Sequence, residues 1–428
     1  MADFIFYFAI FFQIILFLIF IRLARHKKFG ILLGSALNPV TFLNVLFVFF
    51  ALDFFALFNV NNAENIYETK LIIDSLDIAW AYLFFVIGCY AMAIGLFLAL
   101  IKEKKYQKNL LLFKGNNRRQ FIFYLTILFA IGAVLVLGQS FDMLISGKLT
   151  RQTFFNENKI LYIIFSMLTP AYAAYIADKK ALDFKVLFVT FIVLFVLFFI
   201  GSRGALLLVF LVYAYLYNAT VKKISNYVYV LAIPVISVGL IYFRYYFRES
   251  WRYSSIGDFI DSNGGVFSVF FNTAEVGMAE VISILLRYGD RIQRFPFESF
   301  IAALMYPLPR SIIEFKPLGG DAAVTSIFSP DRWDLSKSEI TITLFSDYYL
   351  QFGMLFSFIG LSLTAYIWMK ALLYGIRMNS SGVILMPFLM WSMYILLRSS
   401  VFNVAGLIWA WLFVAILCNY KFTSKNAN

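Results

Sequence analysis

Apolar segments of membrane-crossing length recur along the whole chain, and they constrain its fold more than any other feature. A helix needs roughly 20 apolar residues to cross the hydrocarbon core of a bilayer. Such segments are Phe4–Ile21, Pro39–Phe58, Ile78–Ile101, Phe121–Leu137, Ile160–Ala177, Val186–Ile200, Ala205–Tyr217, Tyr227–Ile241, Phe352–Met369, Val383–Leu397 and Val401–Tyr420. They predict an all-α polytopic integral membrane protein with about 11 transmembrane helices, in a range of about 10–12.

The composition agrees with this class. Of the residues, 62% are hydrophobic and 14% are charged, whereas soluble domains carry about 25% charged residues. The formal net charge of +12 could indicate nucleic-acid binding, but the basic residues cluster in short loops between apolar segments, as membrane topology requires. We therefore expect no nucleic acid as a partner. The first apolar segment has no basic leader and no small-residue cleavage site, so we interpret it as a span and not as a signal peptide.

The loops between the predicted spans alternate in charge. One set is basic and contains Arg22, Arg25, Lys27, Lys28, Lys102, Lys104, Lys105, Lys108, Lys114, Arg118, Arg119, Lys179, Lys180, Lys185, Lys222, Lys223, Lys370, Arg377, Lys421 and Lys425. The other set is acidic or mixed and contains Glu64, Glu68, Asp74, Asp77, Asp142 and Glu157. Because cytoplasmic loops are enriched in Lys and Arg, this pattern predicts a cytoplasmic C-terminus and an N-terminus outside.

This topology divides the chain into three segments. Residues 1–246 form an N-terminal bundle of about eight helices, residues 247–351 a large outer loop, and residues 352–428 a C-terminal bundle of about three helices. The loop would be periplasmic in a cell that has a periplasm. Its many arginines do not contradict an outer location, because long loops cross the membrane regardless of their charge.

Two rows of arginines lie in or beside the large loop. Residues four apart share one face of a helix, and the first row continues the eighth predicted span as Arg244, Arg248 and Arg252. The second row follows the apolar helical stretch Ala274–Leu286 and consists of Arg287, Arg291 and Arg294. Fixed positive charges at a membrane surface suit a substrate whose phosphates lie at the same depth, such as a lipid-linked pyrophosphate.

The rest of the large loop is less regular. Ser299–Leu308 is apolar but too short to cross a bilayer, and Pro307 and Pro309 end it. We expect this stretch to lie in the outer membrane interface as an amphipathic element. Ser254–Gly265 predicts a turn-rich connection, and Glu314–Asp321, with its adjacent glycines, predicts a loop.

Two long apolar runs must each cross the membrane twice, because basic residues flank both of their ends. Val186–Asn218 is interrupted only at Gly201–Gly204, and Val383–Tyr420 only at Arg398–Ser400. Each run therefore predicts two helices that meet at an outer turn. Each turn places an arginine beside a helix N-terminus, whose free N–H groups attract anions.

These two arginines have alternative interpretations. Either side chain could extend to the lipid headgroups without any further role. The glycines around Arg203 allow a close backbone approach, which favours an anion-binding role there. For Arg398 both interpretations stay open. Asp53, an intramembrane carboxylate near the outer end of the second span, has two interpretations of its own that also stay open. It is either functional or a polar contact inside the bundle.

The inventory of reactive side chains excludes several chemistries on the outer face. The one histidine, His26, lies in the first cytoplasmic loop, which excludes histidine catalysis and histidine metal ligands outside. Cys89 and Cys418 lie within apolar segments and imply no disulfide. A carboxylate-only Mg²⁺ or Mn²⁺ site stays open but lacks a compact ligand spacing; its ligands would come from Asp321, Asp331, Asp334 and Glu339. We predict no metal and no cofactor.

Arginine and carboxylate groups remain. Arginine binds phosphate oxygens bidentately and stays protonated, so it can hold a pyrophosphate leaving group while the sugar–phosphate bond breaks. A carboxylate can accept the proton of an attacking hydroxyl. For each carboxylate the alternative is an ion pair with a loop arginine.

Three segments resemble bacterial O-antigen (oligosaccharide repeat unit) polymerases of the Wzy class. They are Gly201-Ser202-Arg203-Gly204-Ala205 at the head of a span, Pro307-Leu308-Pro309-Arg310 with Lys316-Pro317 in the large loop, and Glu339–Gly360 with its Gln351-Phe352-Gly353-Met354. The likeness covers the whole chain in size and topology. The spacing from Arg310 to Gly320 is one residue short of the Arg-x₁₀-Gly pattern of some members, so that motif is not carried over.

This resemblance implies an inner-membrane enzyme of C-type glycosyltransferase architecture that acts on the periplasmic face without a metal. It would transfer the growing glycan from undecaprenyl pyrophosphate to the non-reducing end of a new lipid-linked repeat unit. The implied partners are the undecaprenyl-pyrophosphate-linked oligosaccharide, membrane lipid, a polysaccharide co-polymerase that sets chain length, and a flippase.

The resemblance also suggests roles for individual residues. The catalytic set, as pyrophosphate binders and possible bases, is Arg203, Arg248, Arg252, Arg310, Glu339 and Asp347. The substrate-binding set is Arg244, Arg287, Arg291, Arg294, Lys316, Arg398 and Asp53. An O-antigen ligase is the alternative enzyme, although ligases of this shape are expected to use a periplasmic histidine. A flippase or transporter is the alternative from another class, but those proteins commonly consist of two similar halves. A scaffold membrane protein is a third alternative, which the arginine spacing disfavours.

Overall fold

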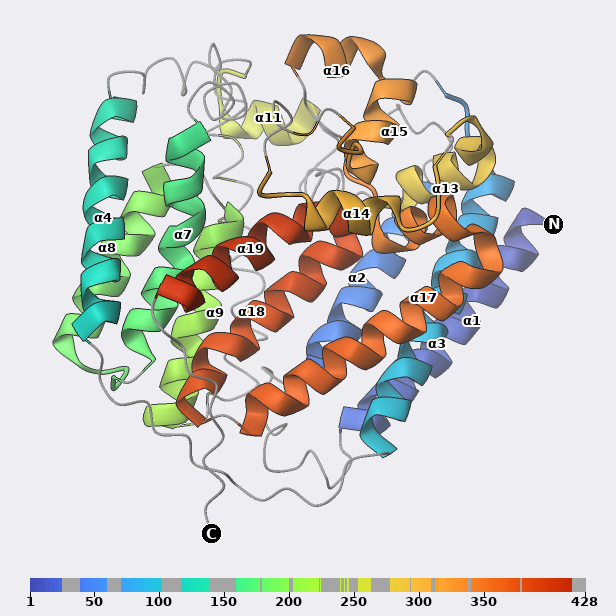
Figure 1. Cartoon of the computed structure of the whole chain (residues 1–428). Coiled ribbons are helices and arrows are strands. Elements are labelled where there is room, and N and C mark those ends of the chain that lie inside the picture. Colours follow the sequence, from blue (N-terminus) through green and yellow to red (C-terminus); the bar gives the residue numbers. More distant parts are fainter. Residues whose placement is uncertain are drawn as a thin grey trace. The chain divides into compact units, whose positions relative to one another are not determined.

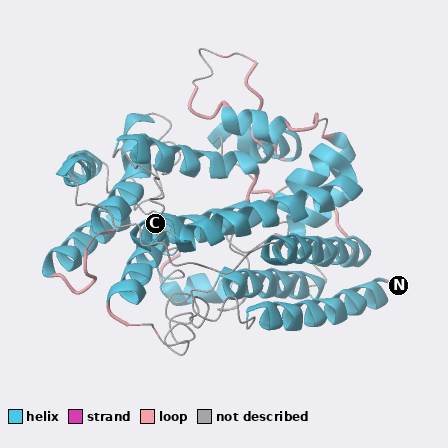
Figure 2. Cartoon of the chain, turned by 60° about the horizontal axis from the view of Figure 1, so that its bottom comes forward, coloured by secondary structure: helices cyan, strands magenta, loops and turns pink. Residues whose placement is uncertain are grey.

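The computed structural model describes most of the chain. The described residues are 1–24, 39–59, 71–101, 117–138, 159–177, 179–199, 203–222, 253–262, 278–292, 294–308, 315–336, 340–377 and 379–417, together with residues 224, 239, 242, 245 and 313. Every element in this part of the chain is a helix, and Figure 2 shows them joined by loops without a strand.

The long helices follow the apolar segments (Figure 1). They are α1 (Ala2–Ala24), α2 (Pro39–Asn59), α3 (Ser75–Ile101), α4 (Asn117–Gly138), α7 (Lys159–Ile176), α8 (Phe184–Phe199), α9 (Arg203–Thr220), α17 (Leu344–Arg377), α18 (Asn379–Arg398) and α19 (Val401–Leu417). The short elements are α11 (Ile256–Ser262), α13 (Ala279–Tyr288), the 3₁₀ turn η2 (Gly289–Arg291), α14 (Glu298–Leu304), α15 (Gly320–Phe328) and α16 (Pro330–Ser336).

The predicted all-helical membrane fold is confirmed at this level. Four described helices, α1, α2, α3 and α17, are long and apolar enough to cross a membrane, and six shorter apolar helices accompany them. Each predicted span has a helix at its position except Tyr227–Ile241, most of which lies outside the described residues. Both predicted helix breaks are also confirmed, since α8 ends at Phe199 and α9 begins at Arg203, while α18 ends at Arg398 and α19 begins at Val401. The number of crossings and their orientation stay predictions.

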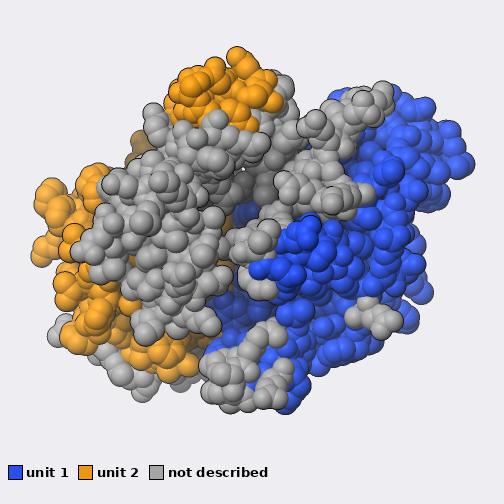
Figure 3. Space-filling view, turned by 90° about the horizontal axis from the view of Figure 1, so that it is seen from above, with its two compact units in different colours: residues 1–106, 271–371, 392–406 blue, residues 107–270, 372–391, 407–428 orange. Residues whose placement is uncertain are grey.

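The chain forms two compact units that interleave in sequence (Figure 3). Unit 1 contains Met1–Tyr106, Phe271–Ala371 and Ser392–Gly406, and unit 2 contains the remaining segments. Unit 1 therefore holds α1–α3, α13–α16, most of α17 and the turn between α18 and α19. It also holds most of the described part of the large loop.

In unit 1, aromatic side chains bring together the start of α1, the end of α2 and the start of α3. The ring of Phe6 on α1 stacks on Phe58 of α2 with centroids 3.9 Å apart, and lies 5.1 Å from the ring of Tyr82 on α3. Fully buried aromatic side chains continue this packing deeper in the bundle, where Phe20 meets Phe47 and Phe47 meets Phe85. Burial of each such side chain contributes roughly 1.5–3 kcal/mol in water; inside a bilayer, shape complementarity replaces that driving force.

Helix α13 lies over this end of unit 1. The Asp53 carboxylate of α2 accepts hydrogen bonds from the backbone N–H groups of Met278 and Ala279, both at 2.7 Å. It therefore caps the N-terminus of α13, where the helix dipole favours a negative charge. Asp53 therefore makes a polar contact within the fold, which is the second of the two interpretations that the sequence left open.

The same end of α3 is closed by a capping box. Asp74 accepts hydrogen bonds from the backbone N–H groups of Leu76 and Asp77, both at 2.9 Å, and Asp77 accepts one from the N–H of Asp74 at 2.9 Å. The Asp77 N–H, ahead of a charge contribution from Arg287, holds the pKa of Asp74 below its usual value. The guanidinium of Arg287 on α13 pairs with both carboxylates, which ties the loop helix to α3.

The helices of the large loop share a small hydrophobic core within unit 1. Its buried members are Val281, Ile284, Leu285, Ile292, Val324, Phe328, Ile340 and Ile342. Because α13, α15 and the segment before α17 all contribute, the described part of the large loop in unit 1 is a folded cap on the end of this unit where α1 begins. Figure 1 shows α13–α16 gathered at that end of α1–α3. The N-terminus and the large loop therefore lie at the same end of unit 1, as the predicted topology requires.

Several local predictions for the large loop can now be compared with the fold. The helix predicted at Ala274–Leu286 is confirmed as α13, although residues 271–277 lie outside the described part. Ser254–Gly265 was expected to be turn-rich, and this is wrong in part because α11 occupies its centre. The loop expected at Glu314–Asp321 ends earlier, since α15 begins at Gly320. The helix expected at Arg244–Arg252 lies on residues that are not described.

Helices α3 and α17 cross at very short range. A Cβ atom at Gly95 would overlap the backbone carbonyl oxygen of Ser362, and one at Gly88 would lie 2.5 Å from the ring of Phe345. Small residues at a helix crossing let two backbones approach, which is typical of helix pairs in membranes. The glycines of α3 therefore set the position of α17, which carries part of the candidate site.

Helix α17 is broken at Gly353. This residue has φ 72° and ψ −179°, a conformation that is essentially restricted to glycine. The break separates a short outer segment, which carries Asp347 and Gln351, from the apolar segment that begins at Met354. The short segment can therefore turn its polar side chains toward the loop helices without interrupting the hydrophobic face of the longer one.

We expect Gly353→Ala to lower the free energy of unfolding by about 1–3 kcal/mol, because a Cβ is strained at this φ even though no atom lies within 4 Å of its position. Thermal unfolding of the detergent-purified protein measures the effect. Gly132→Ala in α4 is the matched control, since that helical position is also open, and it should be neutral or stabilising by up to about 1 kcal/mol. Equal midpoints for the two variants would contradict the assignment of a strained glycine.

Unit 2 contains α4, α7, α8, α9, α11, the end of α17 and most of α18 and α19. Its helices pack through aromatic and hydroxyl groups, with Phe123 stacked on Tyr175 at 4.5 Å and Tyr172 hydrogen-bonded to Thr190 at 2.7 Å. The ring of Phe259 on α11 packs against Tyr245.

Candidate functional site

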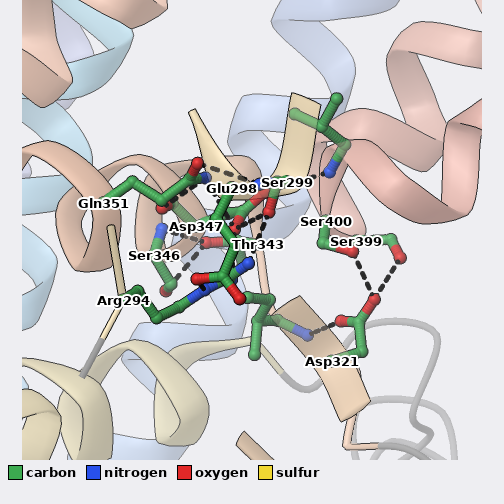
Figure 4. Close-up of polar contacts among 12 residues, drawn as sticks. Arg294, Glu298, Ser299, Asp321, Thr343, Ser346, Asp347, Gln351, Ser399 and Ser400 are labelled. Carbon is green, nitrogen blue, oxygen red and sulfur yellow. Dashed lines mark hydrogen bonds and ion pairs between the residues drawn. The ribbon is translucent and has the colours of Figure 1, made fainter. Parts of the chain in front are cut away.

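A buried polar network lies beside the turn between α18 and α19 in unit 1 (Figure 4). It joins four separate stretches of sequence around two carboxylates, Asp321 and Asp347. Both carboxylates are almost fully buried, and each accepts hydrogen bonds from several protein groups. We refer to this group as the carboxylate cluster; its other members are Arg294, Glu298, Ser299, Gln351, Ser399, Ser400 and Asn403.

Asp347 lies in the first turn of α17. One carboxylate oxygen, Oδ1, accepts hydrogen bonds from Arg294 Nη1 at 2.9 Å, Ser299 Oγ at 2.7 Å and Gln351 Nε2 at 3.0 Å. The other oxygen, Oδ2, accepts the backbone N–H of Val401 at 3.1 Å. Because Val401 is the first residue of α19, Asp347 connects the beginning of two apolar helices with the loop.

Arg294 neutralises Asp347 at the base of the loop. Its side chain is 1% exposed and donates through all three nitrogens: Nε to Glu298 at 2.9 Å, Nη1 to Asp347, and Nη2 to Ser299 Oγ at 3.0 Å. A guanidinium without water must find such partners, because an unpaired buried charge is very costly. Arg294 was predicted to bind substrate, and the structure gives it two carboxylates of the protein itself.

Asp321 occupies the first turn of α15. Its Oδ1 accepts the backbone N–H of Ile342 at 2.5 Å, and its Oδ2 accepts the hydroxyls of Ser400 at 2.7 Å and Ser399 at 3.2 Å. The side-chain amide of Asn403 donates to the same Oδ2. Asp321 therefore joins α15, the segment before α17 and the first turn of α19.

The sequence predicted that the N-terminus of α19 would attract an anion. In the structure the anionic groups beside it are carboxylates of the protein, since Asp347 receives the N–H of Val401 and Asp321 receives the hydroxyl of Ser400. The positive end of the helix dipole favours both charges. Arg398, the last residue of α18, lies half-buried beside this turn.

Gly320 allows the two carboxylates to approach. A Cβ at this position would lie 2.8 Å from Asp347 Oδ1, 2.7 Å from Arg294 Nη1 and 2.6 Å from Ile342 Cδ1. The backbone of α15 therefore lies directly against the Arg294–Asp347 pair. Any larger residue would separate α15 from α17.

Burial raises the pKa of Asp321 to about 6, from an ordinary value of 3.8. The hydrogen bonds from Ile342 and Ser400 act in the opposite direction, while the charge of Asp347 adds to the rise. Asp321 is thus a carboxyl that takes up a proton in mildly acidic conditions, and it does so next to a second carboxylate.

This shift predicts a dependence of stability on pH. The folded carboxyl holds its proton below about pH 6 and the unfolded one only below about 3.8, so the folded state binds more protons in that window and is stabilised as the pH falls. Between pH 7 and pH 5 the gain is about 1 kcal/mol. We expect the difference in melting temperature between the wild type and Asp321→Asn to move in favour of the wild type on acidification. Parallel melting curves at both pH values would contradict the shift.

The other described candidates make contacts of their own within unit 1, and both Arg287 and Arg291 lie over the ring of Tyr288. Arg287 pairs with Asp74 and Asp77, and Arg291 lies with its guanidinium 4.7 Å from the ring centroid of Tyr288. The ammonium of Lys316 donates to two backbone carbonyls, those of Tyr306 at 3.1 Å and Leu308 at 2.9 Å. Lys316 therefore holds the turn after α14 in place.

Several predicted residues cannot be placed. Arg244, Arg248, Arg252, Arg310 and Glu339 lie outside the described residues, and the side chain of Arg203 does as well, although its backbone begins α9. Their roles stay predictions. No group of three or more possible metal ligands occurs in the described part of the chain.

Sequence reasoning missed the central place of Asp321, which it considered only as a possible metal ligand. It also missed Ser299, Ser399, Ser400 and Asn403. One signal for Asp321 was present in the sequence, because this carboxylate is directly followed by the apolar residues of a short helix. A carboxylate that is buried with such a helix needs hydrogen-bond donors. The donors themselves carry no signal in a single sequence.

The described geometry indicates what this cluster can do. Every oxygen of Asp321 and Asp347 already accepts protein donors, so these groups hold the N-terminal ends of α17 and α19 and the loop helices in a fixed arrangement. Asp347 remains a predicted base, and to act as one it would need to exchange a protein donor for a substrate hydroxyl. No known protein family, curated protein or solved structure matches the chain.

Proposed function

We propose that this protein is a membrane glycosyltransferase that polymerises lipid-linked oligosaccharide repeat units on the outer face of a bacterial inner membrane. In this reaction an acceptor sugar hydroxyl attacks the anomeric carbon of the growing glycan. The bond from that carbon to the pyrophosphate oxygen breaks, undecaprenyl pyrophosphate leaves, and a base takes the hydroxyl proton.

One observation supports this proposal more than any other. The described part of the loop in unit 1, which carries Arg287, Arg291 and Arg294, is folded as a cap at the end of this unit where α1 begins, α2 ends and α3 begins, and it is joined to those helices by Asp53, Asp74 and Asp77. Basic groups of the loop are thereby held at the boundary of the apolar helices. A pyrophosphate attached to a membrane lipid lies at the same depth.

The proposed roles follow from side-chain chemistry. Arg203, Arg248, Arg252 and Arg310 bind the two phosphates and neutralise the charge that develops as the sugar leaves. Arg291 and Arg398 are further phosphate ligands at the same end. The carboxylate cluster keeps the helix ends in place, which makes Asp347 a positioning residue as well as a candidate base beside Glu339.

A deletion strain tests the proposal against its alternatives. Loss of the polymerase leaves single repeat units on the lipid of the cell surface (the outer lipid). A plasmid copy of the gene restores the ladder of longer polymers. Loss of a flippase leaves no repeat unit on the outer lipid, and loss of a ligase leaves polymer that stays on undecaprenyl pyrophosphate. Either of these two outcomes would replace the proposed function by the alternative.

A further inference from the structure

The segment from Arg294 to Leu308 presents an apolar surface. Phe295, Phe297, Leu304 and Leu308 are exposed by 50%, 60%, 71% and 42%, and Phe315 just beyond the segment by 78%. Several large apolar side chains exposed within one short segment are unfavourable in water and mark a surface that contacts another apolar phase. We refer to this surface as the α14 surface.

The charges of this segment are turned inward. Its two ionisable side chains, Arg294 and Glu298, pair with each other at 2.9 Å and are only 1% and 12% exposed. Arg294 also pairs with Asp347. The carbonyls of Tyr306 and Leu308 are likewise satisfied by the ammonium of Lys316. Polar groups are thus neutralised on the inner side while phenylalanine and leucine face outward, as a non-aqueous environment requires.

The α14 surface continues directly into the apolar face of α17. The ring of Phe297 packs edge-on against Phe352 at 5.1 Å, and Phe300 stacks on Tyr348 at 5.9 Å. Beyond Phe352 the exposed residues of α17 are Met354, Leu355, Phe356, Ile359, Leu363 and Ile367. Since α17 is one of the helices long and apolar enough to cross a membrane, the same lipid that covers its face extends over α14.

The backbone of Phe297 adopts a conformation that is unfavourable for a residue other than glycine. Phe297 has φ 66°, a left-handed value that costs a non-glycine residue about 1–2 kcal/mol. The conformation directs the chain into α14 and brings the ring against Phe352. Strain of this size persists only where the surrounding structure stabilises it.

We propose that the α14 surface is inserted into the outer leaflet of the bilayer, where the acyl chains of membrane lipids cover Phe297 and Leu304. The helix does not cross the membrane; it lies in it as a re-entrant element that is anchored from the protein side by the Arg294–Glu298–Asp347 group. This inference concerns lipid contact and does not depend on the proposed reaction.

Site-directed spin labelling tests the insertion. Single cysteines replace Phe297 or Leu304 in a full-length variant whose Cys89 and Cys418 are alanine, and the labelled protein is reconstituted into liposomes of phosphatidylethanolamine and phosphatidylglycerol. Accessibility of the label to oxygen, which concentrates in lipid, is compared with accessibility to a water-soluble nickel chelate. Leu355→Cys on the exposed face of α17 is the lipid control, and Asp331→Cys on α16 is the aqueous control.

We expect both labels to show an oxygen-to-nickel ratio like that of Leu355→Cys and several-fold above that of Asp331→Cys. A ratio like that of Asp331→Cys would overturn the proposal, because the surface would then face water. Protection from both reagents would overturn it as well, because a second copy of the chain or another protein would then cover the surface. The readout involves no catalysis, so a failed activity assay does not affect it.

Discussion

Asp347→Asn is expected to lower the free energy of unfolding by about 3–5 kcal/mol. The substitution keeps the size of the side chain but removes one of the two carboxylates that pair with the buried guanidinium of Arg294, so that only Glu298 remains. It also replaces one carboxylate oxygen with an amide NH₂. That NH₂ faces either the donors around Oδ1 or the backbone N–H of Val401, and it cannot accept their hydrogen bonds. A buried charge that loses its partner is among the most destabilising single changes in a folded protein.

Thermal unfolding in detergent, followed by tryptophan fluorescence, measures this effect. Asp331→Asn is the matched control, since that carboxylate is exposed on α16, and it should change the midpoint little. Glu298→Gln should cost less than Asp347→Asn, because the side chain of Glu298 is partly exposed whereas that of Asp347 is fully buried. A midpoint for Asp347→Asn equal to that of Asp331→Asn would contradict the role of this pair.

Arg248→Ala and Arg310→Ala are each expected to abolish long polymer in cells without lowering the protein level. Each removes a permanently charged, bidentate phosphate ligand, and loss of one such group from a transition state reduces rates on the order of 10²–10³-fold. The measurement is the length distribution of the surface polysaccharide on a gel, with protein abundance measured by immunoblot. Arg377→Ala, at a predicted cytoplasmic loop, is the control and should leave the ladder unchanged.

Normal ladders from both variants at normal abundance would remove the proposed phosphate contacts. Labelling of cysteines introduced at the same two positions gives an independent check. A membrane-impermeant thiol reagent should reach them from outside, and reaction only from the cytoplasmic side would contradict the predicted topology.

The positions of the long helices could be predicted from the sequence because the length of an apolar run is itself the physical requirement for crossing a bilayer. The start of α17 could not. The prediction began at Phe352, whereas the helix begins at Leu344 and continues through the break at Gly353. The segment before Gly353 carries Asp347 and Gln351. Because these residues are polar, the segment does not look like a membrane span, although it is a helix that packs against other parts of the chain and not against lipid.

Helix α11 shows a signal that was present and was not used. Ser255 accepts the backbone N–H of Asp258 at 3.0 Å through its hydroxyl, and this spacing of a serine and an acidic residue is that of a capping box. The turn-forming residues around it suggested an irregular connection. Here the local cap determined the structure more than the composition did.

The partners of the carboxylates could not be predicted. Asp53 caps a helix that begins 226 residues later in the chain, and Asp321 contacts Ser400 at a separation of 79 residues. A single sequence shows that an intramembrane or loop carboxylate needs donors, but not which backbone or hydroxyl group the fold brings to it. For the same reason Arg294 could be predicted as a cation at the outer surface but not as the neutralising partner of Asp347.

Reconstitution tests the proposed activity most directly. The purified protein is incubated in liposomes with undecaprenyl-pyrophosphate-linked repeat units, with and without a chelator, and the products are separated by length. The proposed function requires a ladder of products that the chelator does not suppress and that the Arg310→Ala variant does not form. Repeat units that remain single with the wild-type protein, or a ladder that appears only with added divalent metal, would contradict it.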